Sequence, residues 1–182
     1  MQEKFKTQNQ AKDFYKRQML DAIAPHMKTF IAEQRMVFIS TSDKHGECDS
    51  SFRSGDFGFV RVINEKYLVY PEFKGNGVLA SAGNISENPH IGMLFIDFFE
   101  NKVGLHVNGK AKIMNNQELL LFIDKEASDV QLTHSSQIIS FWILVEVEEA
   151  YIHCSRNIPL LKRNEDTLQN EQSRPIDYFK LS

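Results

Sequence analysis

Several segments are rich in β-branched and aromatic residues, and the last of them alternates apolar with polar side chains from Val145 to Glu148; these patterns predict short β-strands. Tight polar turns separate the segments, which favours antiparallel pairing of consecutive strands. The run from His90 to Phe98 is almost continuously apolar, so we expect a strand that is buried on both faces. The expected strands are Met36 to Ser42, Glu47 to Phe52, Phe57 to Val62, Tyr67 to Tyr70, His90 to Phe98, Lys102 to Met114 and Ile138 to Ile152.

Apolar residues recur at helical spacing in other segments, which predicts flanking helices. The first runs from Gln8 to Ala24, where Pro25 interrupts the pattern, and a second runs from about Pro25 to Gln34. Both are expected to cover one side of a sheet or barrel. A further helix is expected from Asn116 to Ala127.

The dipeptide Asn108-Gly109 has two interpretations. It is the strongest local signal for a two-residue hairpin turn, which would divide the segment from Lys102 to Met114 into two strands. A glycine within a strand can instead mark a β-bulge, which would leave one continuous strand.

The stretch from Tyr70 to Pro89 carries the clearest candidate chemistry, because a glycine-rich turn joins a strand to a short helix. Gly75 and Gly77 allow a ligand to approach the backbone closely, and Asn76 is a candidate helix cap. The free N–H groups at the start of a helix favour an anion, and Lys74 adds a positive charge beside them. The pattern therefore predicts a phosphate site.

The same letters, from Gly75 to Ala80, satisfy the G-x-G-x-x-G/A fingerprint of dinucleotide-binding Rossmann domains, and Asp97 lies about 20 residues further on. Two observations weigh against this alternative. The residues from Pro71 to Lys74 separate the strand from the first glycine, and the rest of the chain lacks alternating strand and helix units. We therefore disfavour a Rossmann domain.

Composition is that of an ordinary globular domain: 182 residues, 42% hydrophobic and 25% charged, with a formal net charge of -3. The absence of a basic excess argues against nucleic-acid binding. Cys48 and Cys154 are too few for a disulfide scaffold and lack metal-site spacing, so we expect no metal and a cytoplasmic location. No signal peptide or apolar run of about 18 residues is present, so no membrane association is expected.

Three runs in order, FISTSDKHGECDSSFRSGDFGFVRV, YPEFKGNGVLASAGNISENPHIGMLFIDF and GLHVNGKAKI, resemble the pyridoxamine 5'-phosphate oxidase-like family of FMN-binding split β-barrels. The resemblance spans Phe38 to Ile113 and continues more weakly from Ala150 to Leu161. It implies a mainly β fold, a six-stranded antiparallel Greek-key barrel. Together with the helical pattern before it and the polar residues after it, the chain is expected to divide into N-terminal helices in 1–35, the barrel in 36–161 and a polar tail in 162–182. The resemblance also implies a homodimer with FMN between subunits, and a bulge rather than a turn at Asn108-Gly109.

The resemblance implies the following FMN contacts. Arg53 would meet the phosphate or ribityl chain, with Ser50 or Ser51 as a hydrogen-bonding neighbour. The other implied contacts are Tyr70, Pro71 and Glu72 along the flavin, Lys74, Gly75, Asn76 and Gly77 at the phosphate, and Ser81 and Arg156, the last from the partner subunit. The characterised oxidases carry an Arg-Lys pair roughly where this chain has Gly77-Val78, and Lys74 compensates for part of that charge.

The resemblance further implies an FMN-dependent oxidoreductase that acts on an unidentified small molecule, with NADH or NADPH as the candidate electron donor. The sequence shows no nucleophile and base pair at a useful spacing, so catalytic residues are not identified. The alternative is a flavin-binding or haem-binding module that does not turn over. An enzyme would oxidise the nicotinamide donor through its flavin, whereas a binding module would not.

Overall fold

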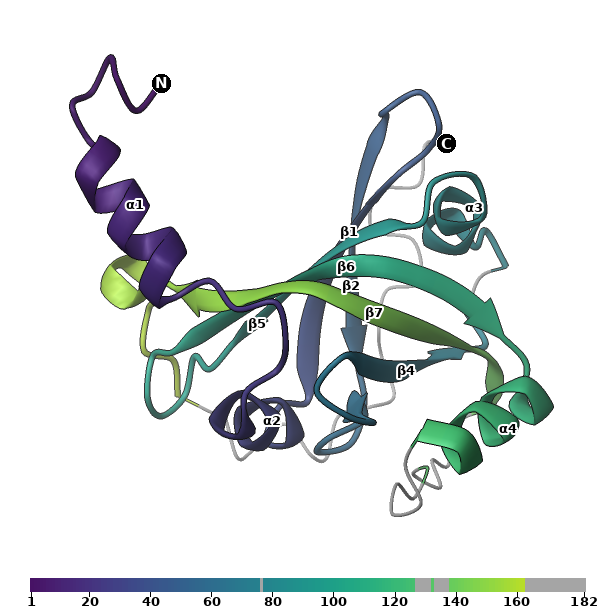
Figure 1. Ribbon diagram of the computed structural model, residues 1–182. Helices are drawn as coiled ribbons and strands as arrows, with labels where there is room; N and C mark the ends of the chain where they lie inside the picture. The colour runs from purple at the N-terminus through teal and green to yellow at the C-terminus, as the bar shows by residue number, and fades with distance from the viewer. Residues whose placement is uncertain (76, 127–131, 133–137, 163–182) are drawn as a thin grey trace, which may run out of the picture.

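The computed structural model describes residues 1–75, 77–126, 132 and 138–162. These residues form one antiparallel sheet with helices around it (Figure 1). The strands are β1 (Met36–Ser42), β2 (Cys48–Ser54), β3 (Arg61–Val62), β4 (Tyr67–Phe73), β5 (His90–Ile96), β6 (Gly104–Met114) and β7 (Ile139–His153). The helices are α1 (Gln8–Arg17), α2 (Pro25–Ala32), α3 (Ala80–Glu87), α4 (Asn116–Glu126) and the short 3-10 helix η1 (Ser155–Asn157).

The sheet is a split β-barrel, as the sequence indicated. Its strand order is β2-β1-β5-β6-β7-β4-β3, and every neighbouring pair is antiparallel. Strand β3 pairs with β4 over two residues alone, so most of that edge of β4 has no strand beside it in the part of the chain that the structure describes. The Arg53 side chain of β2 reaches Glu72 of β4, which shows that the open edges of these two strands face each other. We call the gap between these two edges, with Arg53 on one side and Glu72 on the other, the split. The sheet has seven strands rather than the expected six, and β3 is the short addition.

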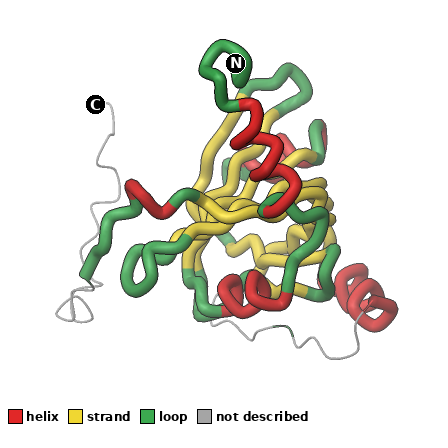
Figure 2. Tube along the Cα trace, turned by 60° about the vertical axis from the view of Figure 1, so that its left-hand side comes forward, coloured by secondary structure: helices red, strands yellow, loops and turns green. Residues whose placement is uncertain are grey.

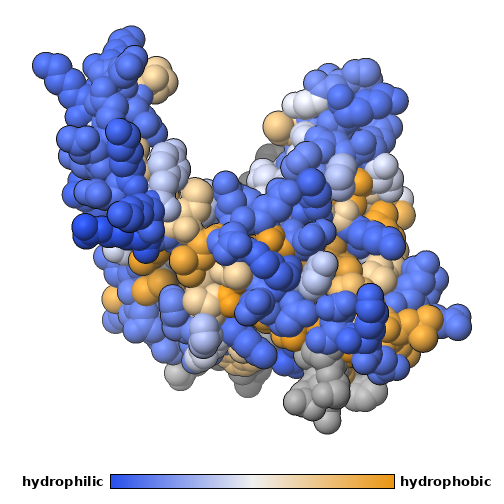
Figure 3. All heavy atoms as spheres, in the orientation of Figure 1, coloured by the Kyte–Doolittle hydropathy of each residue, from blue (hydrophilic) through white to orange (hydrophobic). Residues whose placement is uncertain are grey.

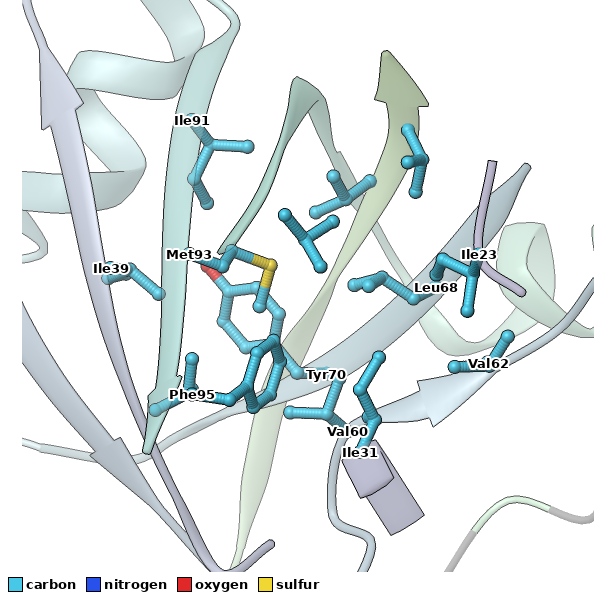
Figure 4. Close-up of a cluster of buried hydrophobic side chains, with 14 of the residues drawn as sticks. Ile23, Ile31, Ile39, Val60, Val62, Leu68, Tyr70, Ile91, Met93 and Phe95 are labelled. Carbon is cyan, nitrogen blue, oxygen red and sulfur yellow. The ribbon is translucent and has the colours of Figure 1, made fainter. Parts of the chain in front are cut away.

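The barrel interior holds the main hydrophobic core. Strand β1 shows this, because Val37, Ile39 and Thr41 are buried while Phe38 and Ser40 between them are exposed. Figure 4 shows side chains from β1, β4 and β5, among them Tyr70 and Met93, directed into this common interior. Burial of each such side chain contributes roughly 1.5–3 kcal/mol. A second cluster lies between the other face of the sheet and α4, and it includes Val69, Leu119, Ile123 and Trp142.

Helix α2 closes one end of the barrel and contributes Met27 and Ile31 to the core. Both α2 and α4 lie at the lower side of the molecule in Figures 1 and 2. The expectation for α2 is confirmed, including the proline in its first turn. None of the helices that the structure describes is long and apolar enough to cross a membrane.

Helix α1 differs from expectation. It ends at Arg17 rather than Ala24, because Leu20 pairs with Ala150 of β7 through two backbone hydrogen bonds. None of its residues is buried, and it projects from the body with a largely hydrophilic surface (Figure 3). It contacts the barrel through the Phe14 ring, which lies edge-on to the Tyr151 ring.

Two strand predictions were partly wrong. The segment from Phe57 to Val62 contributes only Arg61–Val62 to the sheet, because a turn closes where the Phe59 N–H donates to the Asp56 carbonyl. Gly58 in this turn has a φ of +66°, a conformation outside the strand region. The segment from His90 to Phe98 ends as a strand at Ile96 and alternates in burial, so it is buried on one face.

The bulge interpretation of Asn108-Gly109 is confirmed, since the register of β6 against β7 shifts between these two residues. A Cβ atom at position 109 would overlap the backbone carbonyl of Glu146, which explains the glycine. The wholly antiparallel sheet excludes a Rossmann domain. Asp97, the candidate ribose-binding acid, instead accepts backbone hydrogen bonds from Phe99, Glu100 and Asn101. The expected Ala127 helix end and residues 163–182 of the expected tail lie outside the described residues.

Candidate functional site

Strand β2 presents its residues alternately to two faces of the sheet. Asp49, Ser51 and Arg53 are half-buried and share the face that looks toward the split, whereas Ser50 is exposed on the opposite face. The Ser50 hydroxyl lies 3.1 Å from that of Ser40. Within one chain, the structure therefore separates Ser50 from the other candidate contacts of this strand.

Helix α3 is anchored on β2 through Ser81. This side chain is 3% exposed, and its hydroxyl donates toward Ser51 Oγ at 3.2 Å, with Asp49 Oδ2 at 3.4 Å. Ser51 in turn donates to Asp49 Oδ2 at 3.0 Å. The Ser81 hydroxyl is thus enclosed between helix and strand, where it fixes the position of the helix.

Among the described residues, no side chain at the N-cap position caps the N-terminus of α3. The cap position is Leu79, with a φ of +53°, and not Asn76 as expected, because the helix begins at Ala80. A leucine side chain cannot accept a hydrogen bond, and the first turn contains no acidic residue. The leading N–H groups of this helix are therefore left for an acceptor from elsewhere.

The turn before α3 is exposed at each described residue from Lys74 to Leu79. The Lys74 N–H donates to the Ile138 carbonyl at 2.9 Å, which fixes the start of the turn against β7. Gly77 has a φ of +83° and open space where a Cβ would lie, so its backbone is accessible. Asn76 itself lies outside the described residues. The glycine-rich turn thus leads to the helix end of α3, three residues later than an Asn76 cap would place it.

Arg53 and Glu72 form an ion pair across the split. Arg53 Nε donates to Glu72 Oε2 at 3.0 Å, and the two side chains are 20% and 15% exposed. Arg53 Nη1 also donates to the Phe52 carbonyl at 3.1 Å. The guanidinium is therefore held in place by two different groups.

The two residues before Glu72 are both buried. Tyr70 points into the barrel, and its hydroxyl is buried without a hydrogen-bond partner among the described residues. Burial raises the pKa of the Tyr70 phenol above its usual range. Pro71 is paired in register with Trp142 and lies on the other face of the strand. In this structure, Glu72 is the member of the Tyr70, Pro71 and Glu72 run that reaches the split.

The charged side chains around the split carry equal numbers of positive and negative charges. Arg53 and Lys74 supply two positive side chains, whereas Glu72 and Asp49 supply two negative ones. Sequence reasoning missed Asp49. The period of two along β2 indicates this residue, because side chains at positions 49, 51 and 53 of one strand must share a face.

Arg156 lies in η1, beyond the end of β7 that is remote from the split. Strand β7 passes beside Glu72 at Phe141, near its start, and reaches η1 only after His153. One chain therefore does not bring Arg156 together with Arg53. A role for Arg156 requires a second subunit.

A histidine pair on the barrel wall was also missed. His106 Nε2 lies 2.8 Å from His153 Nδ1, and the His106 ring stacks on Tyr151 with ring centres 4.7 Å apart. Burial, together with the nearby His153, lowers the pKa of His106. The two residues are 47 positions apart in sequence, so only the register of β6 and β7 reveals the pair.

A surface hollow of about 830 Å³ lies near the opposite face of β2, lined by Arg35, Phe52, Asp56, Phe57 and Asp97 among others. Glu33 and Glu100 also line it, so acidic side chains outnumber basic ones there. An anionic ligand is disfavoured in such a hollow. The groups that suit a phosphate lie at the split and at the start of α3 instead.

Solved structures share this fold at low sequence identity. HupZ from group A Streptococcus is 20% identical, with 71% of this chain and 93% of that chain covered and a TM-score of 0.51. A candidate pyridoxamine 5'-phosphate oxidase from Lactobacillus delbrueckii is 14% identical, with 74% of this chain and 98% of that chain covered and a TM-score of 0.50. Likenesses at this level of identity establish the fold.

Among curated proteins, none matches this chain in sequence. A family model described as pyridoxamine 5'-phosphate oxidase, PNPOx_N, matches residues 23–153. That match covers well over half of the chain, and it includes all the strands of the barrel. The chain therefore belongs to the pyridoxamine 5'-phosphate oxidase family.

Proposed function

We propose that this protein binds FMN and acts as an FMN-dependent oxidoreductase on a small molecule. The observation that carries the proposal is the uncapped N-terminus of α3, which follows the exposed Lys74 turn. Such a helix end attracts an anion through its free N–H groups and its dipole. The residues that are present therefore suit a phosphate monoester, the terminal group of FMN.

The site residues have separate tasks. Lys74 and the backbone around Gly75 and Gly77 would hold the phosphate, with the first N–H groups of α3 completing the cradle. Arg53 lies on the strand that Ser81 anchors to this helix, and its guanidinium can pair with a phosphate oxygen or a ribityl hydroxyl. The edge of β4 at Glu72 has no strand beside it and is open to the chain of the ligand.

When bound, the isoalloxazine supplies hydride transfer between an electron donor and the substrate. The chain's own task is to orient that ring and to limit the access of water to it. We propose NADH or NADPH as the electron donor.

The assembly that we propose is a homodimer with the flavin between subunits. Arg156 is remote from Arg53 within one chain, and in such a dimer the Arg156 of one subunit can lie at the site of the other. Cys48 and Cys154 are free and exposed thiols, which supports the cytoplasm as the proposed location.

An absorption spectrum tests the binding proposal. Purified protein, before and after FMN is added and the excess removed, is expected to retain flavin bands. The Arg53→Ala variant is expected to retain less flavin, whereas Arg17→Ala, a control in the exposed helix α1, is expected to match the wild type. A Soret band, or no chromophore and no FMN uptake, would contradict the proposal in favour of a haem-binding or ligand-free barrel.

Turnover is tested separately. The flavin-loaded protein is mixed anaerobically with NADH or NADPH, and the loss of flavin absorbance is followed. Bleaching of the flavin within seconds supports an oxidoreductase. A flavin that stays oxidised with both donors contradicts the proposed donor and favours the alternative, a binding module that does not turn over.

A further inference from the structure

The ion pair of Arg53 and Glu72 occupies the part of the guanidinium that a phosphate would use. A guanidinium binds phosphate through a pair of parallel N–H groups along one edge. Arg53 Nε donates to Glu72 Oε2, and Arg53 Nη1 donates to the Phe52 carbonyl. The Nε–H shares one edge of the guanidinium with an Nη2 N–H, so this edge already has a donor committed to Glu72, whereas Nη1 keeps a second N–H besides the one that it gives to Phe52. A bidentate phosphate contact along the Nε edge must displace Glu72.

Glu72 is the acceptor that can leave. The Phe52 carbonyl belongs to the backbone of β2, which is paired with β1 along its whole length. Glu72 is a side chain, and Arg53 is the hydrogen-bonding partner recorded for it among the described residues. Its side chain is 15% exposed, so it has a path toward solvent.

The other carboxylate of the site is held more firmly. Asp49 accepts hydrogen bonds from the hydroxyls of Ser51 and Ser81, and the second of these is almost fully enclosed. Asp49 therefore stays in place when a ligand enters. With Arg53 and Lys74 balanced by Asp49 and Glu72, an incoming phosphate creates an excess of negative charge unless Glu72 moves away.

We propose that Glu72 is a specificity-determining residue of this site, because its carboxylate competes with the phosphate of the ligand for Arg53. This inference rests on the proposed function, in which the ligand is a flavin phosphate. Its consequence concerns selectivity. The charge of Glu72 weakens binding of the phosphorylated flavin and leaves binding of the flavin without phosphate almost unchanged.

The test compares FMN with riboflavin, which differs only by the phosphate. Dissociation constants are measured by quenching of flavin fluorescence for the wild type and for Glu72→Gln. The glutamine keeps the shape and removes the charge, so we expect FMN to bind about tenfold more tightly, as one competing charge-assisted hydrogen bond predicts. Riboflavin affinity is expected to change less than about twofold.

Glu148→Gln is the matched control for net charge. Glu148 is ion-paired with Lys110 at 3.1 Å on β6, away from the split, so its variant is expected to bind both flavins as the wild type does. Circular dichroism verifies that each variant is folded. If Glu72→Gln does not fold, Glu72→Asp replaces it, because the shorter side chain weakens the pair with Arg53, and tighter FMN binding remains the expected result.

The outcomes separate the two proposals. Tighter FMN binding in the Glu72 variant alone, with riboflavin unchanged, supports the inference. If that variant binds FMN as tightly as the wild type or more weakly, the inference is overturned while the proposal of FMN binding stands. An equal gain in affinity for riboflavin also overturns the inference. If neither the wild type nor any variant binds either flavin, the proposed function fails and this inference fails with it.

Discussion

The hydroxyl of Ser81, in the first turn of α3, lies 3.2 Å from the hydroxyl of Ser51 on β2. This contact joins the open helix end to the edge strand that carries Arg53. Asn84 adds a second link from the same helix, because its amide donates to the buried Thr41 of β1 at 3.1 Å. The position of the candidate phosphate cradle is thus set by hydrogen bonds that also stabilise the fold.

Replacement of Ser81 by alanine is expected to lower the free energy of unfolding by about 1 kcal/mol, since one enclosed hydrogen bond is lost. The measurement is urea denaturation followed by circular dichroism. Ser86→Ala is the control within the same helix, because the Ser86 hydroxyl donates only to the helix backbone at Ala82. If both variants match the wild type, the contact between Ser81 and Ser51 does not stabilise α3.

Replacement of Gly109 by alanine is expected to lower the free energy of unfolding by about 3 kcal/mol, because the new Cβ overlaps the Glu146 carbonyl in the bulge. Gly83→Ala is the matched control. Gly83 lies in α3 with open space around it, so alanine there is expected to stabilise the protein by roughly 0.5–1 kcal/mol. Thermal melts of the two variants measure the expected loss of stability in one and the expected gain in the other. A Gly109→Ala variant as stable as the wild type would refute the bulge.

Replacement of Tyr70 by phenylalanine is expected to leave the free energy of unfolding unchanged or to raise it by about 1 kcal/mol. The reason is that the buried hydroxyl has no partner among the described residues, so its removal loses no hydrogen bond. Thr41→Val is the contrast, since that buried hydroxyl accepts from Asn84 and its loss is expected to destabilise. Equal destabilisation by both substitutions in chemical denaturation would mean that Tyr70 is hydrogen-bonded.

The histidine pair predicts a pH dependence of stability. The pKa of His106 is lowered from 6.5 in the folded chain, so the unfolded chain binds the proton more strongly. Stability is therefore fully present above pH 6.5 and decreases as the pH falls below this value, until the folded His106 is protonated as well. His106→Gln is expected to flatten this dependence between about pH 7 and pH 5.

Denaturation midpoints at a series of pH values measure the effect. His26→Gln removes an exposed histidine in α2 and is expected to keep the wild-type dependence. A wild-type slope in the His106 variant would show that another group carries the dependence.

The local sequence pattern was sufficient to predict those helices and strands whose structure depends on their own side chains. The β-branched and aromatic residues of β1 predicted Met36–Ser42 with correct bounds, and the proline of α2 marked its first turn. Elements decided by distant partners were less predictable. The end of α1 depends on the pairing of Leu20 with Ala150, and no local pattern indicates that contact.

In the candidate site, too, features that depend on local residues were predictable and contacts between distant residues were not. The glycines and the lysine of the turn predicted an exposed segment before a helix, and Lys74, Gly75 and Gly77 are exposed. That this turn holds an anion stays a prediction. The pairing of Arg53 with Glu72 could not be predicted, since it depends on how the curled sheet brings β2 to β4. The enclosed position of Ser81 likewise follows from the docking of the helix.

The most direct test of the account is the affinity of the protein for FMN relative to riboflavin, measured by calorimetry on the wild type and on Lys74→Gln. We predict that the wild type binds FMN at least tenfold more tightly and that this preference decreases about tenfold in Lys74→Gln, because one charged phosphate contact is lost. Lys110→Gln, at the exposed ion pair with Glu148, is expected to keep the preference. Equal affinity of the wild type for the two flavins, or no binding of either, would contradict a phosphate site at Lys74 and the start of α3.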